Sequence, residues 1–232
     1  MGSAVIHMTY YTEILLLIGA LLIPLIAQLY VKMTFNTYAG VRNSRHITGE
    51  EAARSILDNN GCSDVRIEHI SGKLSDHYDP RARVLRLSDS TYGMDTIAAV
   101  GIAAHEAGHA IQHAEGYAFM KIRSAFVPVV SICSNLWYIM FIAGIILRAV
   151  GLIEVAIILF SSICVFQLIT LPVEFNASNR AIDILECNGM LEFSEVNGTS
   201  KVLRAAAMTY IAALLSSVLQ LLRLILISNR RR

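Results

Sequence analysis

The most reactive stretch of the chain is "GIAAHEAGHAIQHAEG", residues 101–116, in which histidines and glutamates interrupt a run of small residues. His105 and His109 are four residues apart, so a helix would place both imidazoles on one face, about 6 Å apart along its axis. Such a pair suits two positions of a tetrahedral zinc ion. Glu106 could then take a proton from a water whose pKa the metal lowers to about 7. The HExxH spacing therefore predicts a zinc hydrolase site, with ordinary surface histidines as the alternative.

His113 continues the same four-residue step, which raises the question of a three-histidine site. It lies about 12 Å along the helix from His105, so one ion cannot bind both. We interpret His113 as a rim or packing residue, with a contact to substrate as the other interpretation.

Glu115 is the nearest alternative for the third ligand, because it stands where the metzincin pattern HExxHxxGxxH has its third histidine. That pattern requires a glycine at position 112 to turn the chain back. This sequence has Gln112, so the helix should continue and carry Glu115 away from the metal. The third ligand must then come from another segment.

The composition indicates a mainly α membrane protein: 55% of residues are hydrophobic, 16% are charged, and the net charge of +1 gives no support for a nucleic-acid partner. Four stretches are long and apolar enough to cross a bilayer, which needs about 20 residues. They are residues 14–31, 127–147, 149–173 and 205–227, and the last of these carries Arg223. No Lys or Arg precedes the first stretch, which favours a retained helix over a secretory signal. The four cysteines show no CxxC spacing and predict neither a thiolate metal site nor a disulfide framework.

The second and third apolar stretches form a predicted membrane hairpin that returns the chain to the side of the HExxH helix. The first acidic residue after that return is Glu174, in "LPVEFNASNRA", which makes it the best candidate for the third ligand. An ordinary interfacial glutamate is the alternative interpretation, and Glu154 is disfavoured because it lies near the opposite end of the third stretch. Asp183 and Glu186 lie later and could orient a ligand.

Residues 33–123 are predicted to form a small α+β domain. "TGEE", residues 48–51, is a capping box for a helix that ends at Asn60-Gly61. Residues 65–70 and 83–88 alternate like strands, and we expect them to form a hairpin with a long connection. A helix should then run from about Asp95 to Glu115. It is a poor candidate for an intramembrane helix, because burying its histidines and glutamates in lipid is expensive.

The resulting organisation has an N-terminal transmembrane helix (1–32), the α+β domain with the HExxH helix (33–123), a transmembrane hairpin (124–173), a helical segment with the third ligand (174–204), and a C-terminal hydrophobic helix with a basic tail (205–232). Lys and Arg are concentrated in 32–123 and 174–204, which places these regions in the cytoplasm. The terminal cluster of residues 230–232, "RRR", argues against this orientation if the fourth helix spans the bilayer.

The motifs "AAHEAGHAIQH" and "EFNASNRA", on either side of a membrane hairpin, resemble those of the neutral zinc metallopeptidases of membranes (the YugP-like family). The order of segments extends this resemblance over nearly the whole chain. The glutamate segment is also similar to the wider HtpX and Ste24 class of membrane metalloproteases, which carry ExxxD there. The resemblance implies one Zn²⁺ ion, bound by His105, His109 and Glu174, with Glu106 as general base. Here Ser178 occupies the aspartate position, so Asn179 or Asp183 would have to support a ligand instead.

We therefore expect a membrane-anchored zinc endopeptidase with a zincin-like α+β domain that acts on an extended peptide. In zincin-like folds substrate adds as a strand, and residues 83–88 are the expected edge. Arg180 is the first candidate for stabilising the oxyanion, before Tyr92, His77 and Tyr210. The alternatives are a zinc-binding scaffold or chaperone-like membrane protein, and a transporter. A structural zinc site usually has four protein ligands, and the few polar residues in the apolar stretches do not repeat between halves.

Overall fold

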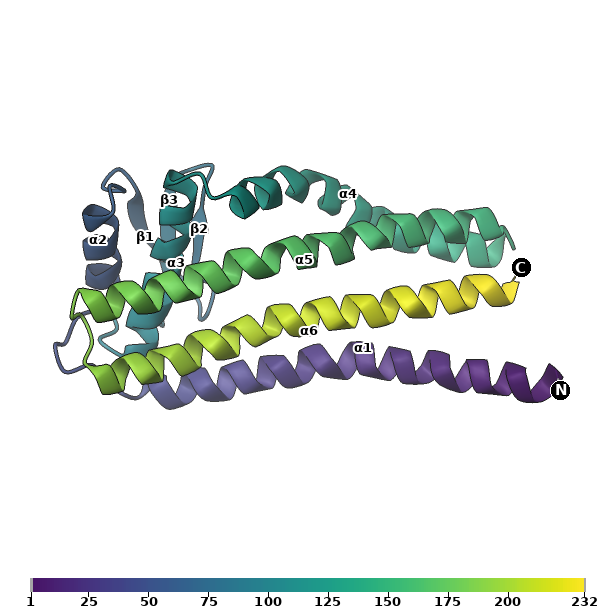
Figure 1. Cartoon of the computed structure of the whole chain (residues 1–232), viewed down its shortest axis with the longest axis horizontal. Coiled ribbons are helices and arrows are strands. Elements are labelled where there is room, and N and C mark those ends of the chain that lie inside the picture. Colours follow the sequence, from purple (N-terminus) through teal and green to yellow (C-terminus); the bar gives the residue numbers. More distant parts are fainter. Residues whose placement is uncertain (1, 232) are drawn as a thin grey trace. The chain divides into compact units, whose positions relative to one another are not determined.

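A computed structural model describes residues 2–231 of the chain, with side chains from residue 10 onward. In chain order its elements are α1 (Gly2–Ala39), α2 (Gly49–Asn59), β1 (Arg66–Ile70), β2 (His77–Asp79), β3 (Val84–Ser88), α3 (Ile97–Ala114), α4 (Ala118–Ile146), α5 (Val150–Cys187) and α6 (Phe193–Arg231). The protein is thus mainly α-helical, as predicted, and the described residues form one small mixed sheet (Figure 1).

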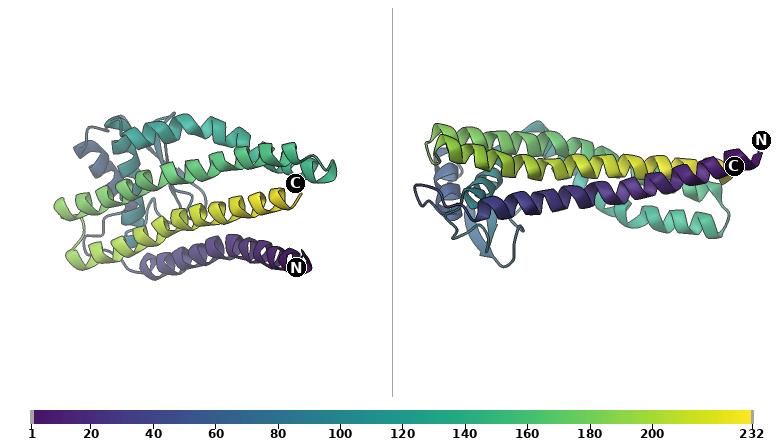
Figure 2. Two further views of the ribbon diagram at one scale, coloured as in Figure 1. Left: turned by 45° about the vertical axis from the view of Figure 1, so that its right-hand side comes forward. Right: turned by 90° about the horizontal axis from the view of Figure 1, so that it is seen from below.

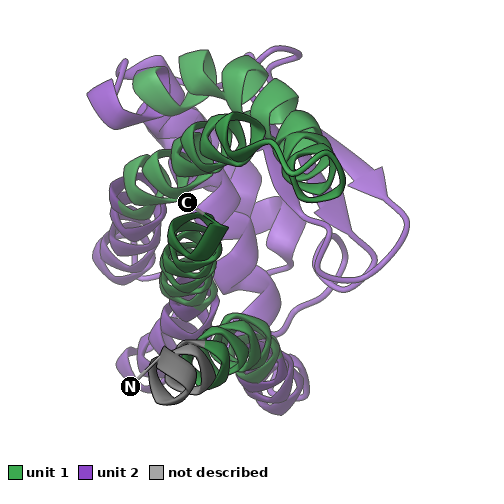
Figure 3. Cartoon of the chain, turned by 90° about the vertical axis from the view of Figure 1, so that its right-hand side faces the viewer, with its two compact units in different colours: residues 1–28, 122–171, 209–232 green, residues 29–121, 172–208 purple. Residues whose placement is uncertain are grey.

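The chain divides into two compact units, coloured separately in Figure 3. Unit 1 comprises Met1–Gln28, Ile122–Leu171 and Thr209–Arg232, and unit 2 comprises Leu29–Lys121 and Pro172–Met208. Every residue proposed above to act on metal or water belongs to unit 2, including Glu174. Helices α1, α4, α5 and α6 each contribute residues to both units.

Unit 1 is built from helices whose apolar side chains point outward. Leu15, Ile132 and Ile158 are 68%, 67% and 70% exposed, and they are typical of their helices. Exposing so much apolar surface to water is unfavourable by about 25 cal/mol per Å², whereas lipid imposes no such cost. Helices α1, α4, α5 and α6 are each long and apolar enough to cross a membrane. These observations define a membrane protein.

The start of α1 lies beside the end of α6 within unit 1, as the views in Figures 1 and 2 agree. The Ser216 hydroxyl donates to the carbonyl of Ala20 at 2.6 Å. Nearer the ends, Arg230 Nη1 lies 3.3 Å from Glu13 Oε1. On the other side of unit 1, α4 and α5 form the expected hairpin, with the rings of Trp137 and Phe160 4.8 Å apart.

The helices extend well beyond the apolar stretches predicted from the sequence. Helix α5 passes through Pro172 without ending and continues to Cys187, so Glu174 lies inside a helix rather than after one. Hydropathy marks only the apolar part of each helix. The polar parts continue in unit 2, where packing rather than lipid stabilises them.

In unit 2 the predicted capping box of α2 is confirmed. The Thr48 hydroxyl accepts from the Glu51 backbone N–H at 3.3 Å, and the Glu51 carboxylate accepts from the Thr48 N–H at 2.8 Å. Such a cap contributes about 1 kcal/mol to helix stability. The helix ends at Asn59, and Gly61 follows with a φ of 69°, as the Asn-Gly pair predicts.

The sheet differs from the predicted hairpin in topology. Its strand order is β1-β3-β2, and β1 pairs with β3 in parallel. The antiparallel partner of β3 is β2, a short strand within the segment predicted as a connection. The expectation that residues 83–88 offer a free edge to substrate is therefore wrong, because β3 has a neighbour on each side. Its burial is that of a central strand: Val84, Leu85 and Leu87 are all fully buried.

The core of unit 2 joins segments that are distant in the sequence. Apolar side chains of α2, the sheet and α3 pack together with residues from α5 and from the start of α6. From α5 the core includes Val173, Ala181 and Leu185, and from α6 it includes Val196 and Leu203. The α+β region thus shares its core with the helical segment that carries Glu174.

Candidate metal centre and active site

Helix α3 positions the two histidines. Its N-cap is Thr96, whose hydroxyl accepts from the Ala99 N–H at 3.3 Å, and Gly116 follows its C-terminus with a φ of 68°. The helix is regular through the motif, so the four-residue step brings the rings of His105 and His109 to a centroid separation of 4.7 Å. The ring of His109 is buried, whereas that of His105 is slightly more exposed.

Helix α5 brings Glu174 to the same point. Its carboxylate Oε2 lies 3.4 Å from His105 Nε2 and 3.5 Å from His109 Nε2, and its side chain is 2% exposed. One ligand atom from each of the three residues lies within 4.8 Å of the other two. In the part of the chain that the structure describes, this is the one group of three or more His, Cys, Asp or Glu residues close enough to share a metal ion. Below we call these residues the metal triad.

Gly108 allows α5 to approach α3 this closely. A methyl group added at Gly108 would lie 3.0 Å from the carbonyl oxygen of Ala177, which is one turn of α5 beyond Glu174. Because that oxygen belongs to the backbone, it cannot rotate away as a side chain could. The small residue inside the motif therefore helps determine where the third member of the metal triad lies.

Each histidine of the metal triad also has a partner at Nδ1, the ring nitrogen that does not face Glu174. The partner of His109 is Gln112 Oε1 at 3.0 Å, and that of His105 is Ser178 Oγ at 3.2 Å. We assigned no supporting role to Gln112 or Ser178 from the sequence. In the sequence, Ser178 stands out only as a departure from ExxxD, and Gln112 only as the residue in place of a turn glycine. A polar residue three positions after a ligand histidine, on the same helix, was the signal that could have identified Gln112.

Asn179 and Asp183, which we expected to compensate for Ser178, both have exposed side chains. Neither side chain has a hydrogen bond or ion pair in the described part of the chain. The structure therefore places Ser178, and neither of these two residues, against the metal triad.

The Glu106 carboxylate lies beside the edge of the sheet. Its Oε2 accepts a hydrogen bond of 3.0 Å from the backbone N–H of Tyr78 in β2. Burial raises the pKa of Glu106, and the neighbouring imidazoles of His105 and His109 only partly oppose that rise. A carboxyl group with a raised pKa is a stronger base than an exposed one, which suits a group that must accept a proton from water.

The residues around the motif have defined partners. Arg180 Nη2 donates to Glu115 at 2.6 Å, and its Nε donates to Asn176 at 2.8 Å. The Arg180 guanidinium holds the pKa of Glu115 below its usual range. The helix does run on past Gln112, as predicted, and Glu115 forms this ion pair instead of joining the metal triad.

His113 packs against the sheet, since its Nδ1 lies 2.8 Å from the Tyr78 hydroxyl. Of the other oxyanion candidates, His77 contacts the carbonyl of Ser75 at 2.8 Å. The ring of Tyr92 packs against that of His69, at a centroid separation of 4.9 Å. Tyr210 belongs to unit 1.

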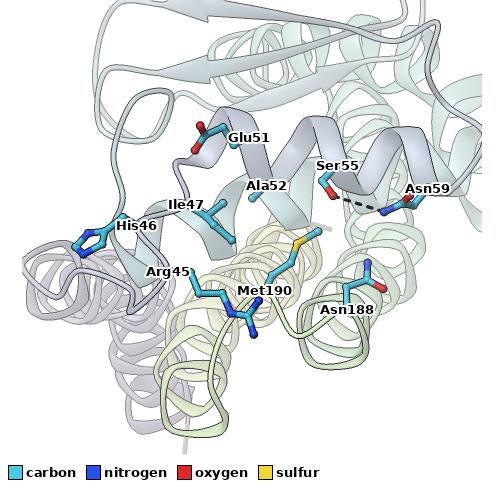
Figure 4. Close-up of a pocket in the computed structure, with 9 residues that line it drawn as sticks. All are labelled: Arg45, His46, Ile47, Glu51, Ala52, Ser55, Asn59, Asn188 and Met190. Atoms are coloured by element: carbon cyan, nitrogen blue, oxygen red, sulfur yellow. Dashed lines mark hydrogen bonds between the residues drawn. The ribbon is translucent and has the colours of Figure 1, made fainter.

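Unit 2 also contains an open cavity of about 690 Å³, shown in Figure 4. It is lined by Arg45, His46, Ile47, Glu51, Ala52, Ser55, Asn59, Asn188 and Met190. None of these residues belongs to the metal triad, so the cavity and the candidate active site have different linings.

The fold and the metal triad define a class of protein, and comparison with known sequences agrees with it. The chain matches the family described as "Putative neutral zinc metallopeptidase" over residues 13–229 and belongs to that family. It is similar to a protein of Bacillus subtilis (strain 168) named "Putative membrane protease YugP", with 48% identity over 214 residues that cover 92% of this chain and 95% of the relative. No solved structure matches the chain. The protein is thus a membrane metallopeptidase by family.

The residues present fit the zinc ion that the family uses. Two imidazole nitrogens and one carboxylate oxygen are common zinc ligands, and they converge here from α3 and α5. Catalytic zinc sites typically have three protein ligands and leave a further position for water or substrate. The metal triad has that number.

Proposed function

We propose that the protein is a membrane-anchored zinc endopeptidase in which His105, His109 and Glu174 bind the ion and Glu106 acts as general base. The convergence of the metal triad beside Glu106 supports this proposal more than any other observation. When bound, zinc supplies a Lewis acid that polarises a peptide carbonyl and makes water more acidic.

Glu106 performs the proton transfers. Its carboxylate takes a proton from the attacking water as the oxygen–carbon bond forms at the peptide carbonyl. It then gives that proton to the amide nitrogen as the carbon–nitrogen bond breaks, so Glu106 ends each cycle unprotonated.

The free edge of β2 is the place where we propose that an extended peptide binds. On one side β2 pairs with β3, and on the other the Tyr78 N–H points to Glu106 instead of to a strand. A peptide added along this edge would form backbone hydrogen bonds next to the general base. This proposal replaces β3 by β2 as the strand that pairs with substrate.

We also propose four membrane crossings with unit 2 in the cytoplasm. Lys and Arg are more numerous in the two segments that make up unit 2 than at the helix ends that lie in unit 1. The basic residues 230–232 favour the reverse orientation. The ion pair of Arg230 with Glu13 offsets one of their positive charges. Each misplaced basic residue opposes insertion only modestly.

Glu106→Gln tests the mechanism. The amide cannot accept the proton, so proteolysis by the purified protein should fall by about 10²–10⁴-fold. The metal triad is unchanged, so bound zinc measured by metal analysis should stay the same. A variant that binds zinc and retains near-normal proteolysis would exclude Glu106 as the base. Wild-type protein that binds zinc but cleaves no unfolded protein substrate would favour the scaffold alternative.

The orientation can be tested by thiol labelling. Cys62 is fully buried, and burial raises the pKa of its thiol, so it is a poor reporter. Cys187, at the end of α5 in unit 2, is exposed. A membrane-impermeant maleimide should label Cys187 only after cells are lysed. In a Cys187→Ser background, Arg148→Cys in the α4–α5 link should be labelled in intact cells, and the reverse pattern would invert the topology.

A further inference from the structure

The side chain of Gln112 is a buried polar group that the proposed mechanism does not use. It is completely buried, three residues after His109 on α3. A buried amide has two N–H donors and an oxygen acceptor, and leaving them without partners is costly. Both donors and the acceptor of the Gln112 amide have hydrogen-bond partners, and each partner belongs to the metal triad or lies close to Glu174 on α5.

The orientation of this amide is determined by its partners. Gln112 Nε2 lies 2.9 Å from the backbone carbonyl oxygen of Val173 and 2.8 Å from Asn176 Oδ1. A backbone carbonyl can only accept, so the group that faces Val173 must be the NH₂. Rotating the amide by 180° would set two oxygens against each other there. The Oε1 atom therefore faces His109.

This orientation determines the tautomer of His109. Gln112 Oε1 lies 3.0 Å from His109 Nδ1 and can only accept a hydrogen bond. Nδ1 must therefore carry the hydrogen, and a neutral imidazole then has its lone pair on Nε2. Nε2 is the atom that faces Glu174, at 3.5 Å. The ring thus directs its lone pair toward the place where the metal would bind.

His105 does not have an equivalent constraint. Its Nδ1 contacts the Ser178 hydroxyl at 3.2 Å, and a hydroxyl can either donate or accept. The same contact is therefore compatible with both tautomers of His105. Only Gln112 determines a tautomer, and it also holds α5 at Val173, the residue that precedes Glu174.

We propose that Gln112 is a positioning residue of the metal centre. It holds His109 in the tautomer that presents the Nε2 lone pair to the ion. The inference rests on the proposed metal-binding role of the triad but not on peptidase activity. Partners of this kind change metal affinity by about 10–100-fold.

The test measures zinc affinity by chelator competition and the melting temperature of the zinc-free protein, both on the full-length protein in detergent. Gln112→Met keeps the volume and loses all three hydrogen bonds, so zinc affinity should fall by about 10–100-fold. Gln112→Glu keeps an acceptor for His109 Nδ1–H but loses the donors to α5. It should lower the melting temperature yet keep zinc affinity within a few-fold of wild type, because carboxylates also serve as partners of ligand histidines.

The matched control is His113→Ala, which loses the contact with Tyr78 from the neighbouring position of α3 and should leave zinc affinity unchanged. Wild-type affinity in Gln112→Met would overturn the proposal. So would an equal loss of affinity in Gln112→Met and Gln112→Glu, because that result indicates a merely structural role. If Gln112→Met does not fold, Gln112→Glu with near-normal affinity supports the proposal and Gln112→Glu with a loss of tenfold or more refutes it. None of these measurements uses proteolysis, so they remain informative if the peptidase proposal fails.

Discussion

The two helices that build the metal triad contribute to it in different ways. On α3 both histidines and Glu106 lie within one five-residue motif, and the regular helix alone sets their spacing. On α5 Glu174 is the one member of the metal triad, and its position depends on how closely that helix packs on Gly108. The α3 half of the site is thus encoded locally, whereas the α5 half depends on the tertiary fold. The two halves should therefore respond differently to substitution.

The largest effect that would test this comparison is expected from Glu174→Ala. It removes a member of the metal triad, so zinc affinity should fall by more than the about 10–100-fold typical of losing a supporting partner. Glu115→Ala is the matched control: it removes a carboxylate that follows the motif but pairs with Arg180. Metal analysis of both variants measures the difference. If Glu115→Ala loses the metal and Glu174→Ala retains it, the third ligand belongs to α3 and the comparison is wrong.

A smaller effect is expected from Gly108→Ala, which changes the packing of α5 without touching a ligand. The added methyl group would lie 3.0 Å from the carbonyl oxygen of Ala177, and such overpacking costs about 1–3 kcal/mol. Both the melting temperature and zinc affinity should fall, because α5 must move outward together with Glu174. Gly93→Ala is the control, since nothing lies within 4 Å of its added methyl group. An unchanged zinc affinity in Gly108→Ala would show that zinc binding does not depend on how closely α5 packs on α3.

The smallest effect is expected from Ser178→Asp, which restores the ExxxD pattern on α5. A carboxylate at this position would accept from His105 Nδ1–H and fix the tautomer that the serine leaves open. Zinc affinity should rise by up to about tenfold. Ser178→Ala, which removes the contact, should lower it by a similar factor. A fall in affinity for Ser178→Asp would mean that the site has no room for the larger side chain.

The sequence was most informative where one element determines the geometry. The HExxH helix, its continuation through Gln112 and the capping box of α2 follow from local spacing and are confirmed. Hydropathy identified the four apolar helices but not their full lengths, because the extensions are stabilised by packing in unit 2. The position of β2 could not be predicted, since the stretch that contains His77–Asp79 is short and lies among turn-forming residues.

The candidate site shows the same division. The residue types of the metal triad were evident from the sequence, and the structure brings His105, His109 and Glu174 together. The supporting contacts of Gln112 and Ser178 depend on how deeply α5 packs on α3 and how it is rotated about its axis. The residue spacing within one segment predicts neither quantity. The expected edge at β3 was wrong for a related reason. An alternating pattern identifies a strand but not its neighbours in the sheet.

The close packing of α3 on α5 also bears on how the motif is written. HExxH leaves two positions open to any residue, and here they are occupied by Ala107 and Gly108. Ala107 is fully buried, and Gly108 has no space for a methyl group without a shift of the neighbouring backbone. In this protein the two positions written x therefore accept fewer residue types than the notation HExxH suggests. A library randomised at these two positions should return almost only small residues among folded, zinc-binding variants, although neither residue has a side-chain atom that could bind metal or move a proton.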